Sequence, residues 1–248
     1  MSDRKANSYN RPRHQLIASI LAQLNGELLC SHGCLFGGGT AMSMRYGEYR
    51  ESVDIDFLVS HLAGYRALRL LMTQPESVRT ITLDNSTLTT LREVRADQYG
   101  IRTVVAAADT GIKFEIVFEA RMALEPPTVS DLICGIAALT PLDMLASKLL
   151  ANSDRWADDS VYSRDLIDIV MQGAAKPLLG QAIAKAANAY GASIERDLSR
   201  AIAKLKSRHG YAEHCLKSLQ MTIPKALLWK KLLRLQRALD DVRVSPSE

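Results

Sequence analysis

Three consecutive glycines, Gly37 to Gly39, constrain the fold of this chain more than any other feature. The short apolar run at 34–36 leads into them, which predicts a buried strand that ends in a tight turn. Thr40 follows directly and is expected to be the N-cap of a helix. Glycines let the backbone approach a phosphate closely, and the first turn of a helix offers N–H groups to it. Alone, such a turn is also compatible with an ordinary strand-to-helix connection.

Two acidic residues on the next predicted strand indicate a chemical role for this turn. The segment 53–59 alternates, so its apolar residues share one face and Asp54 and Asp56 share the other. Two carboxylates side by side repel each other unless a cation lies between them. Mg²⁺, with Mn²⁺ as the alternative, prefers such oxygen ligands and polarises phosphoryl groups. The glycine turn and the acid pair together predict a phosphate cradle beside a metal site, whereas the acid pair alone fits a solvated strand face equally well.

The remaining patterns predict an α+β fold. Alternating apolar segments at 101–107 and 112–118 are expected to be strands, and segments 13–29 and 62–72 are expected to be helices. A break at 125–127 suggests a domain boundary, after which the apolar spacing is helical. We therefore expect a mixed β-sheet flanked by helices in a catalytic domain over residues 1–128, followed by a mostly helical domain over 129–248.

Further charged residues are candidates for the same chemistry. Glu115 lies mid-strand between the apolar residues Phe114 and Ile116, so it is a candidate third metal ligand or an acid paired to a neighbouring cation. A helix is expected to begin at Thr140-Pro141, and on it Lys148 and Arg155 share one polar side. That side suits a triphosphate or is a solvated basic stripe. Asp165 and Asp168 on the following helix are candidates to orient Lys148 or Arg155, or they pair with Arg164 and its neighbours.

The cysteines and the hydropathy pattern exclude several classes of protein. The four cysteines are Cys30, Cys34, Cys134 and Cys215. Residues 1–13 are polar and no run of about 18 apolar residues occurs, so we expect a cytoplasmic protein with reduced thiols and no membrane partner. The spacing of Cys30, His32 and Cys34 matches no common zinc module, so zinc is not expected.

Basic residues are concentrated near the C-terminus. The whole chain carries a formal net charge of +4, but between Arg196 and Arg237 eleven Lys and Arg residues face only Asp197 and Glu213, a local net charge of +9. The residues Lys230, Arg234 and Arg237 fall on one face of a predicted helix, opposite the apolar face formed by Leu228, Leu232, Leu235 and Leu239. Such a stripe is typical of RNA-binding surfaces, although solvated helix faces also carry such charges and an acidic protein partner would suit it too.

Four motifs, in order, resemble those of one known family. They are Gly38-Gly39-Thr40-Ala41, the stretch from Arg50 to Phe57, Lys113-Phe114-Glu115, and Lys148 with Arg155 and the segment from Arg164 to Asp168. This series is similar to the AbiEii/AbiGii toxin family of the DNA polymerase β-like nucleotidyltransferase superfamily, over about residues 15–172. The resemblance implies a toxin of a bacterial toxin–antitoxin or phage-defence system, neutralised by a cognate antitoxin. It also implies transfer of a nucleotide from an NTP to RNA, with the 3′ end of tRNA as the expected acceptor.

The resemblance also implies roles for individual residues. Asp54, Asp56 and Glu115 would bind the metal, and with Lys148 and Asp165 they form the predicted catalytic set. The predicted nucleotide-binding set is Gly38, Gly39, Thr40, Ser52, Lys148 and Arg155. The third acid of the superfamily is usually Asp, so Glu115 departs from the pattern by one methylene group. Asp168 is the alternative to Asp165 as the late acid.

Two other functions share these motifs. An antibiotic-modifying nucleotidyltransferase would use the same glycine turn and acid pair on a small molecule, but the basic C-terminal region favours RNA as the acceptor. A degenerate fold that only binds its ligand is the second alternative, and the intact acid pair argues against it.

Overall fold

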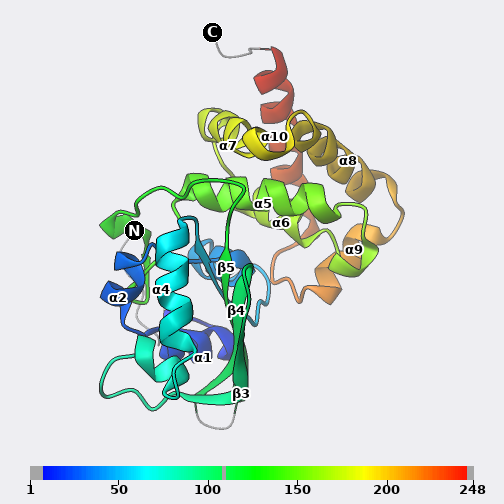
Figure 1. Cartoon of the computed structure of the whole chain (residues 1–248). Coiled ribbons are helices and arrows are strands. Elements are labelled where there is room, and N and C mark those ends of the chain that lie inside the picture. Colours follow the sequence, from blue (N-terminus) through cyan, green and yellow to red (C-terminus); the bar gives the residue numbers. More distant parts are fainter. Residues whose placement is uncertain (1–7, 108–109, 245–248) are drawn as a thin grey trace. The chain divides into compact units, whose positions relative to one another are not determined.

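The chain divides into two compact units that are not simple halves of the sequence. The first unit contains Met1–Glu48 and Ser52–Thr140, and the second contains Tyr49–Glu51 and Pro141–Glu248. The computed structural model (Figure 1) describes residues 8–107 and 110–244. Residues 1–7, which form part of the polar N-terminal segment, lie outside the described residues.

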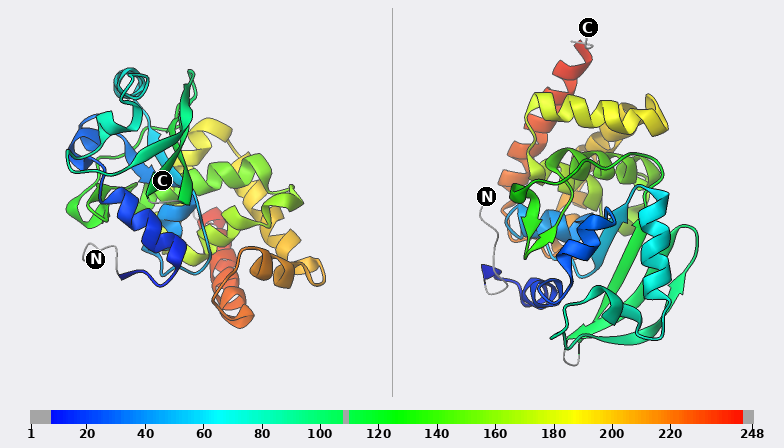
Figure 2. Two further views of the ribbon diagram at one scale, coloured as in Figure 1. Left: turned by 90° about the horizontal axis from the view of Figure 1, so that it is seen from below. Right: turned by 60° about the vertical axis from the view of Figure 1, so that its left-hand side comes forward.

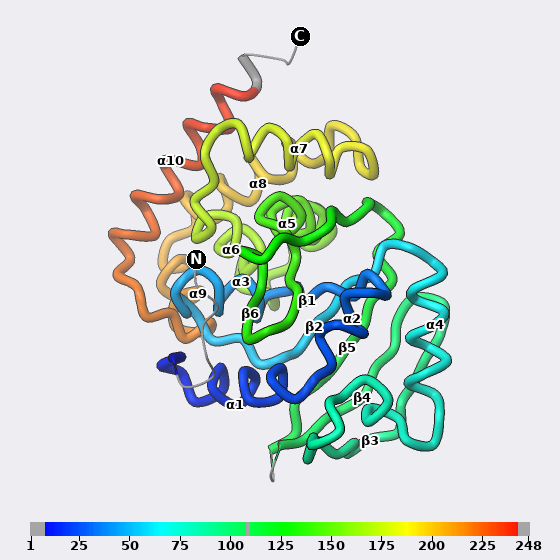
Figure 3. The backbone as a smooth tube through the Cα atoms, turned by 90° about the vertical axis from the view of Figure 1, so that its left-hand side faces the viewer, coloured from blue at the N-terminus to red at the C-terminus, as the bar shows by residue number. Residues whose placement is uncertain are grey.

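A mixed five-stranded sheet organises the first unit. Its strands are β1 (Leu35–Gly37), β2 (Ile55–Val59), β3 (Thr89–Ala96), β4 (Gly100–Ala107) and β5 (Thr110–Phe118). Their order in space is β1-β2-β5-β4-β3, and the strand labels in Figure 3 follow this order. Only β2 and β5 run parallel, and the other neighbours are antiparallel. The predicted α+β fold is confirmed.

Helices and aromatic side chains form the core of the first unit on one face of the sheet. The helical segments are α1 (Pro12–Leu21), α2 (Gly26–Ser31), α3 (Gly38–Arg45), α4 (Leu62–Met72), η2 (Ser77–Ile81) and η3 (Val129–Asp131). Helix α4 lies along the sheet (Figures 1 and 2) and packs Tyr65 against Phe118, with ring centroids 5.3 Å apart. The rings of Phe36, Phe57 and Phe114 form a continuous buried row across β1, β2 and β5. This packing fixes β2 and β5, which carry Asp56 and Glu115, and β1, which leads into the glycine turn.

The single helix expected over residues 13–29 is wrong, because the structure has two helices there. Helix α1 ends at Leu21, and Leu24 then forms a bridge with Thr82. The side chain of Asn25 accepts a hydrogen bond from the backbone N–H of Leu28 at 3.0 Å and begins α2. A polar N-cap within an apolar pattern therefore restarts the helix in a new direction.

The second unit is helical apart from Tyr49–Glu51. Its segments are α5 (Pro141–Arg155), η4 (Asp159–Val161), α6 (Arg164–Gln172), α7 (Lys176–Tyr190), α8 (Ser193–Ser207), α9 (Tyr211–Ser218) and α10 (Lys225–Val244). Helices α5, α7 and α8 pack on one another, and α10 contacts α6 to α9. The start of α5 at Pro141 agrees with the predicted Thr140-Pro141 signal.

The two units separate after Thr140, whereas the sequence places the boundary after residue 128. The intervening residues form a small hairpin of β6 (Leu132–Ile133) and β7 (Ile136–Ala137). The carboxylate of Asp131 pairs with Arg45 of α3 at 2.8 Å, and the N–H of Leu139 bonds the carbonyl of Phe36 at 2.9 Å. These contacts bind the hairpin to the first unit, and the proline-rich break at 125–127 is a loop within that unit.

Two expectations from composition can be compared with the described residues. All four cysteines remain thiols, and no disulfide joins them. Within the described ranges, no helix combines the length and the apolar character that crossing a bilayer requires.

Candidate functional site

The two candidate acids lie at the beginning of β2. Ile55 and Phe57 are completely buried in the core, and Asp56 between them points to the other face and is half-buried. The strand begins at Ile55, so Asp54 comes just before it, and Val53 is 41% exposed instead of sharing the core face as expected. The hydrogen bond to Glu115 raises the pKa of the Lys113 ammonium group, and the charges of Asp56 and Asp54 raise it further.

Gly38 fits against Asp56 so closely that no side chain could replace its hydrogen. A Cβ atom at Gly38 would lie 2.4 Å from the Oδ2 of Asp56. The φ of Gly38 is +67°, a left-handed conformation that favours glycine. Since Gly38 is also the first residue of α3, the first turn of a helix lies directly beside a carboxylate. The predicted neighbourhood of turn and acid is present in the fold.

Thr40 does not cap α3 as expected, because the helix already begins at Gly38 with Gly37 as its N-cap. Gly39 and Thr40 therefore both belong to the first turn. The buried Thr40 hydroxyl donates a hydrogen bond to the Oγ of Ser52 at 2.9 Å. This bond joins the first turn of α3 to the segment that leads into Asp54.

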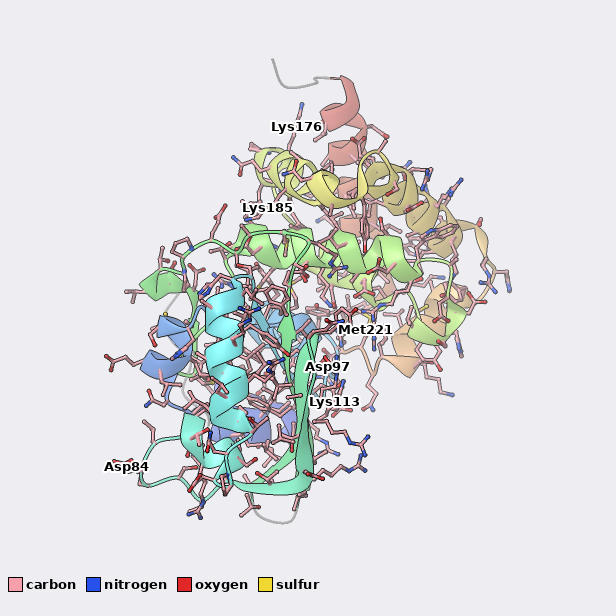
Figure 4. All side chains as sticks on the ribbon, viewed as in Figure 1. Asp84, Asp97, Lys113, Lys176, Lys185 and Met221 are labelled. Atoms are coloured by element: carbon pink, nitrogen blue, oxygen red, sulfur yellow. The ribbon has the colours of Figure 1, made fainter. Side chains whose placement is uncertain are left out.

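Glu115 lies beside Asp56 but binds two cations. The two residues are direct partners on the parallel strands β2 and β5. The Glu115 carboxylate accepts hydrogen bonds from the Nε of Arg102 at 2.6 Å and the Nζ of Lys113 at 2.8 Å. Burial raises the pKa of Glu115, but the bonds from Lys113 and Arg102 outweigh it and lower the pKa below its usual value. Arg102 also reaches Asp97 at 3.2 Å, and Figure 4 labels the two ends of this chain of charges, Asp97 and Lys113.

The residues present fit a Mg²⁺ ion bound together with a nucleotide. Within residues 8–107 and 110–244, no group of three or more His, Cys, Asp or Glu side chains is gathered closely enough to hold a metal by itself. Mg²⁺ commonly takes only one or two carboxylates and completes its shell with water and substrate phosphates. Asp54 and Asp56 are two such carboxylates, and the first turn of α3 begins against Asp56.

In the second unit, Lys148 is buried in an ion-pair network. Its side chain is only 7% exposed, so the alternative of a solvated basic stripe is wrong for this residue. The Nζ of Lys148 lies 3.2 Å from the Oδ1 of Asp165 and 2.7 Å from the Oδ2 of Asp168. Arg155 donates two hydrogen bonds to Asp165, at 2.6 and 2.9 Å. The two acids therefore hold both cations in place, as the sequence suggested.

Sequence reasoning missed the role of the inserted segment Tyr49–Glu51. The hydroxyl of Tyr49 donates to the Oδ1 of Asp168 at 2.7 Å, and Arg50 donates to both oxygens of the same carboxylate. Arg50 belongs to the recognised motif before Asp54, so its presence could have raised the question of a partner. Nothing in the sequence indicates that this partner is Asp168.

The charges in this network stabilise one another. Burial raises the pKa of Asp168, but Arg50 and Lys148 overcome that effect and hold it well below its usual value. Asp165 behaves in the same way, with Lys148 and Arg155 opposing the effect of burial. Both acids are therefore ionised when the network is intact.

The predicted basic stripe of α10 is exposed. Lys230, Arg234 and Arg237 are accessible to solvent, and the opposite side of the helix is buried through Leu228, Leu232, Leu235 and Leu239. Lys231 is not part of this stripe, because its Nζ donates to the carbonyl of Met171 at 3.3 Å.

Comparisons with known proteins give one family and one fold. The model of a family described as the nucleotidyl transferase AbiEii toxin of a type IV toxin–antitoxin system matches residues 19–241. A Helicobacter pylori protein assigned to the nucleotidyltransferases by inference has a similar crystal structure, with a TM-score of 0.54, 16% identity and coverage of 100% of both chains. JHP933 of Helicobacter pylori is similar at a TM-score of 0.54 and 16% identity, over 96% of each chain. At this identity the likeness concerns the fold alone. No curated protein matches the chain.

Proposed function

Because the chain belongs to the AbiEii nucleotidyl transferase toxin family, we propose that this nucleotidyltransferase uses Mg²⁺ to transfer NMP from an NTP to RNA, with the 3′ end of tRNA as the acceptor. The observation that carries the proposal is the contact between Gly38 and Asp56. It brings the helix start proposed to bind phosphate against the carboxylate proposed to bind metal.

The proposed roles follow from the positions of the residues in the first unit. The N–H groups of Gly38, Gly39 and Thr40 bind the triphosphate, because the first turn of a helix has unsatisfied donors and a positive end. Ser52 positions that turn through its bond with Thr40. Asp54 and Asp56 hold Mg²⁺, and Glu115 is the third acid of the proposed site. When bound, the metal supplies charge neutralisation at the phosphoryl group.

Lys148, Arg155 and Asp165 stay predictions that rest on the sequence motifs. We propose that the two cations bind the nucleotide, with Asp165 as the residue that orients them. In the proposed reaction, the acceptor hydroxyl oxygen forms a bond to the α-phosphorus of the NTP. The bond from that phosphorus to the β-phosphate bridge breaks, and pyrophosphate and the hydroxyl proton leave.

The family is described as a nucleotidyl transferase toxin of a toxin–antitoxin system, which implies a nucleotide substrate and an antitoxin partner. We propose that modified tRNA is the basis of toxicity, that the reaction takes place in the cytoplasm, and that the system serves in phage defence. Induced expression should arrest growth, and expression of the Asp56→Asn variant should not. Growth arrest by that variant would contradict the proposal.

Incubation with total tRNA, Mg²⁺ and α-labelled NTPs tests the reaction. The wild type should label RNA, and Asp56→Asn should not. Asp84→Asn is a matched control, because Asp84 is an exposed acid in a loop of the same unit (labelled in Figure 4) and its loss should leave labelling unchanged. Equal labelling by wild type and Asp56→Asn would overturn the proposal.

Two further arms separate the alternatives. Label transferred to an aminoglycoside and not to RNA would make the protein a small-molecule nucleotidyltransferase. Calorimetry of NTP binding with and without Mg²⁺ tests the degenerate binding module, which would bind without metal and transfer nothing.

A further inference from the structure

One row of residues crosses all five strands of the sheet in register. Gly37 of β1 pairs with Asp56 of β2, which pairs with Glu115 of β5. Glu115 pairs with Arg102 of β4, and Arg102 pairs with Arg95 of β3. Directly opposite residues in neighbouring strands point to the same face of a sheet. The face that carries the candidate acids therefore changes from acidic to basic toward β3.

Two irregularities in β3 turn two arginines toward this face. Thr90 pairs with the buried Val105, so Thr90 lies on the core side. In a regular strand Arg92 would share that side, but the register shifts between Thr90 and Arg92, and Arg92 lies opposite Val104 instead. The hydroxyl of Thr103 donates to the carbonyl of Arg92 at 2.5 Å and fixes the backbone at this point.

A second shift repeats the effect three residues later. Arg92 and Arg95 are an odd number of residues apart and would lie on opposite faces of a regular strand. The second shift pairs Arg95 with Arg102, so both arginines end on the face of Asp56. Bulges re-aim side chains in this way and are frequent at sheet edges and beside active sites.

The two arginines differ from the other cations of the face. Arg102 and Lys113 are held by Glu115. Arg92 and Arg95 are exposed, and among the described residues neither forms an ion pair or a side-chain hydrogen bond. Arg95 lies directly opposite Arg102, whose charge is already paired with Glu115 and Asp97, so Arg95 is the member of this pair that is left to meet another anion.

Charged residues also protect an edge strand such as β3 from pairing with other chains. That protection requires only charge at the edge and would be met by arginines on either face. It does not account for two register shifts that bring both arginines to the side of the acids. The arrangement instead fits a ligand with several phosphates that extends across the strands.

We propose that Arg92 and Arg95 bind the phosphate backbone of the acceptor RNA as it leads to Asp56. This inference rests on the proposed function, because it assumes that the acceptor is RNA. Three strand spacings separate β2 from β3, a distance of roughly 14 Å. At about 3.4 Å per stacked nucleotide, that is the length of roughly four nucleotides next to the reacting 3′ end.

The test measures RNA binding without chemistry. Affinity for unmodified tRNA is determined in the absence of NTP over a range of salt concentrations, for the wild type and for an Arg92→Ala/Arg95→Ala variant. Loss of two phosphate contacts should weaken binding for all RNA sequences and reduce the magnitude of the salt slope by roughly 2. The KM for tRNA should rise, and the KM for NTP should stay unchanged.

The matched control is Arg66→Ala/Arg79→Ala, which removes the same charge from exposed positions on α4 and η2. It should bind RNA as the wild type does. A second variant, Arg92→Lys/Arg95→Lys, keeps the charges and should retain most of the affinity, so a folding defect in the alanine variant would be recognised.

Equal affinity and salt slope for the wild type and the Arg92→Ala/Arg95→Ala variant would overturn the inference. An equal loss in the Arg66→Ala/Arg79→Ala control would also overturn it, because binding would then follow net charge alone. If the wild type labels RNA but the β3 variant binds normally, only this inference fails. If the wild type labels no RNA at all, the proposed function fails first.

Discussion

Arg50 donates hydrogen bonds from its Nε and Nη2 atoms to the two carboxylate oxygens of Asp168, at 2.7 and 2.8 Å. The side chains are 4% and 0% exposed, so water scarcely competes for this pair. Paired parallel bonds between a guanidinium and a carboxylate fix both distance and orientation. A residue just before the candidate acids is thereby tied to one that follows 118 positions later.

Replacing Asp168 with Asn should destabilise the protein strongly. Arg50 and Lys148 would keep their buried charges and lose the opposing one, and breaking a buried ion pair in this way costs about 3–5 kcal/mol. Chemical denaturation of the wild type and of Asp168→Asn measures the difference in the free energy of unfolding. The control is Asp158→Asn, at an exposed acid of the same unit, which should change it little. A difference below that of the control would contradict the importance of the network.

The stabilisation by Asp168 should depend on pH in one direction. Its pKa in the folded protein lies well below the usual 3.8, so its contribution is complete above about that pH and is lost as the pH falls below it. The gap in melting temperature between wild type and Asp168→Asn should be constant from pH 7 to pH 5 and should narrow below about pH 3.8. A gap that widens on acidification would show that the charge of Asp168 is not the cause.

Gly38→Ala should abolish nucleotide transfer and should destabilise the protein less than Asp168→Asn does. The new methyl group would collide with the Asp56 carboxylate and displace either the helix start or the acid. Gly47→Ala is a close control, because Gly47 also has a positive φ but has nothing within 4 Å of the added atom. Because both positions have a positive φ, both variants should lose about 1–2 kcal/mol of stability. Only Gly38→Ala should also lose the ability to label RNA. Comparable labelling of RNA by the two variants would contradict the proposed phosphate site.

Glu115→Gln should separate two roles of this residue. If Glu115 binds metal as predicted, the variant needs more Mg²⁺ to reach half of its maximal rate. If it serves only to hold Arg102 and Lys113, the Mg²⁺ requirement should equal that of the wild type and only the thermal stability should fall. Rates measured over a series of Mg²⁺ concentrations distinguish the two, and the first result is expected.

Neutralising the α10 stripe should weaken binding to RNA. A triple change of Lys230, Arg234 and Arg237 to Gln removes three exposed charges without touching the buried leucines. The salt slope for tRNA binding should become smaller by about 3 if all three residues bind phosphates. An unchanged slope would remove α10 from the RNA-binding surface and leave it as a candidate site for an acidic antitoxin.

Local patterns in the sequence predicted the elements whose cause is local. Alternation identified the segments of β4 and β5, and the Thr140-Pro141 signal located the start of α5. The glycine turn and Asp56 could be recognised because glycine at a positive φ and an acid between two core residues leave a mark in the sequence. The resemblance of the motifs to one family then implied roles for the candidates Glu115, Lys148, Arg155 and Asp165.

Features that depend on distant partners escaped the sequence. The burial of Lys148 follows from Asp165 and Asp168, which occupy another helix. The bulges of β3 arise from pairing with β4, and a regular alternation would have placed Arg92 and Arg95 on opposite faces. In each case the local pattern was compatible with exposure or regularity, and tertiary contacts decided the outcome.

The excursion of Tyr49–Glu51 into the helical unit has a consequence for the protein during translation. Domains generally fold in the order in which they leave the ribosome. Here the N–H of Thr222 bonds the carbonyl of Tyr49, and Asp168 binds Arg50, so the segment must wait for residues made long after it. A nascent chain stalled after Thr140 would hold Asp54 and Asp56 with no anchor for the preceding residues. The segment that precedes Asp54 therefore reaches its folded position only after Asp168 and Thr222 have been synthesised.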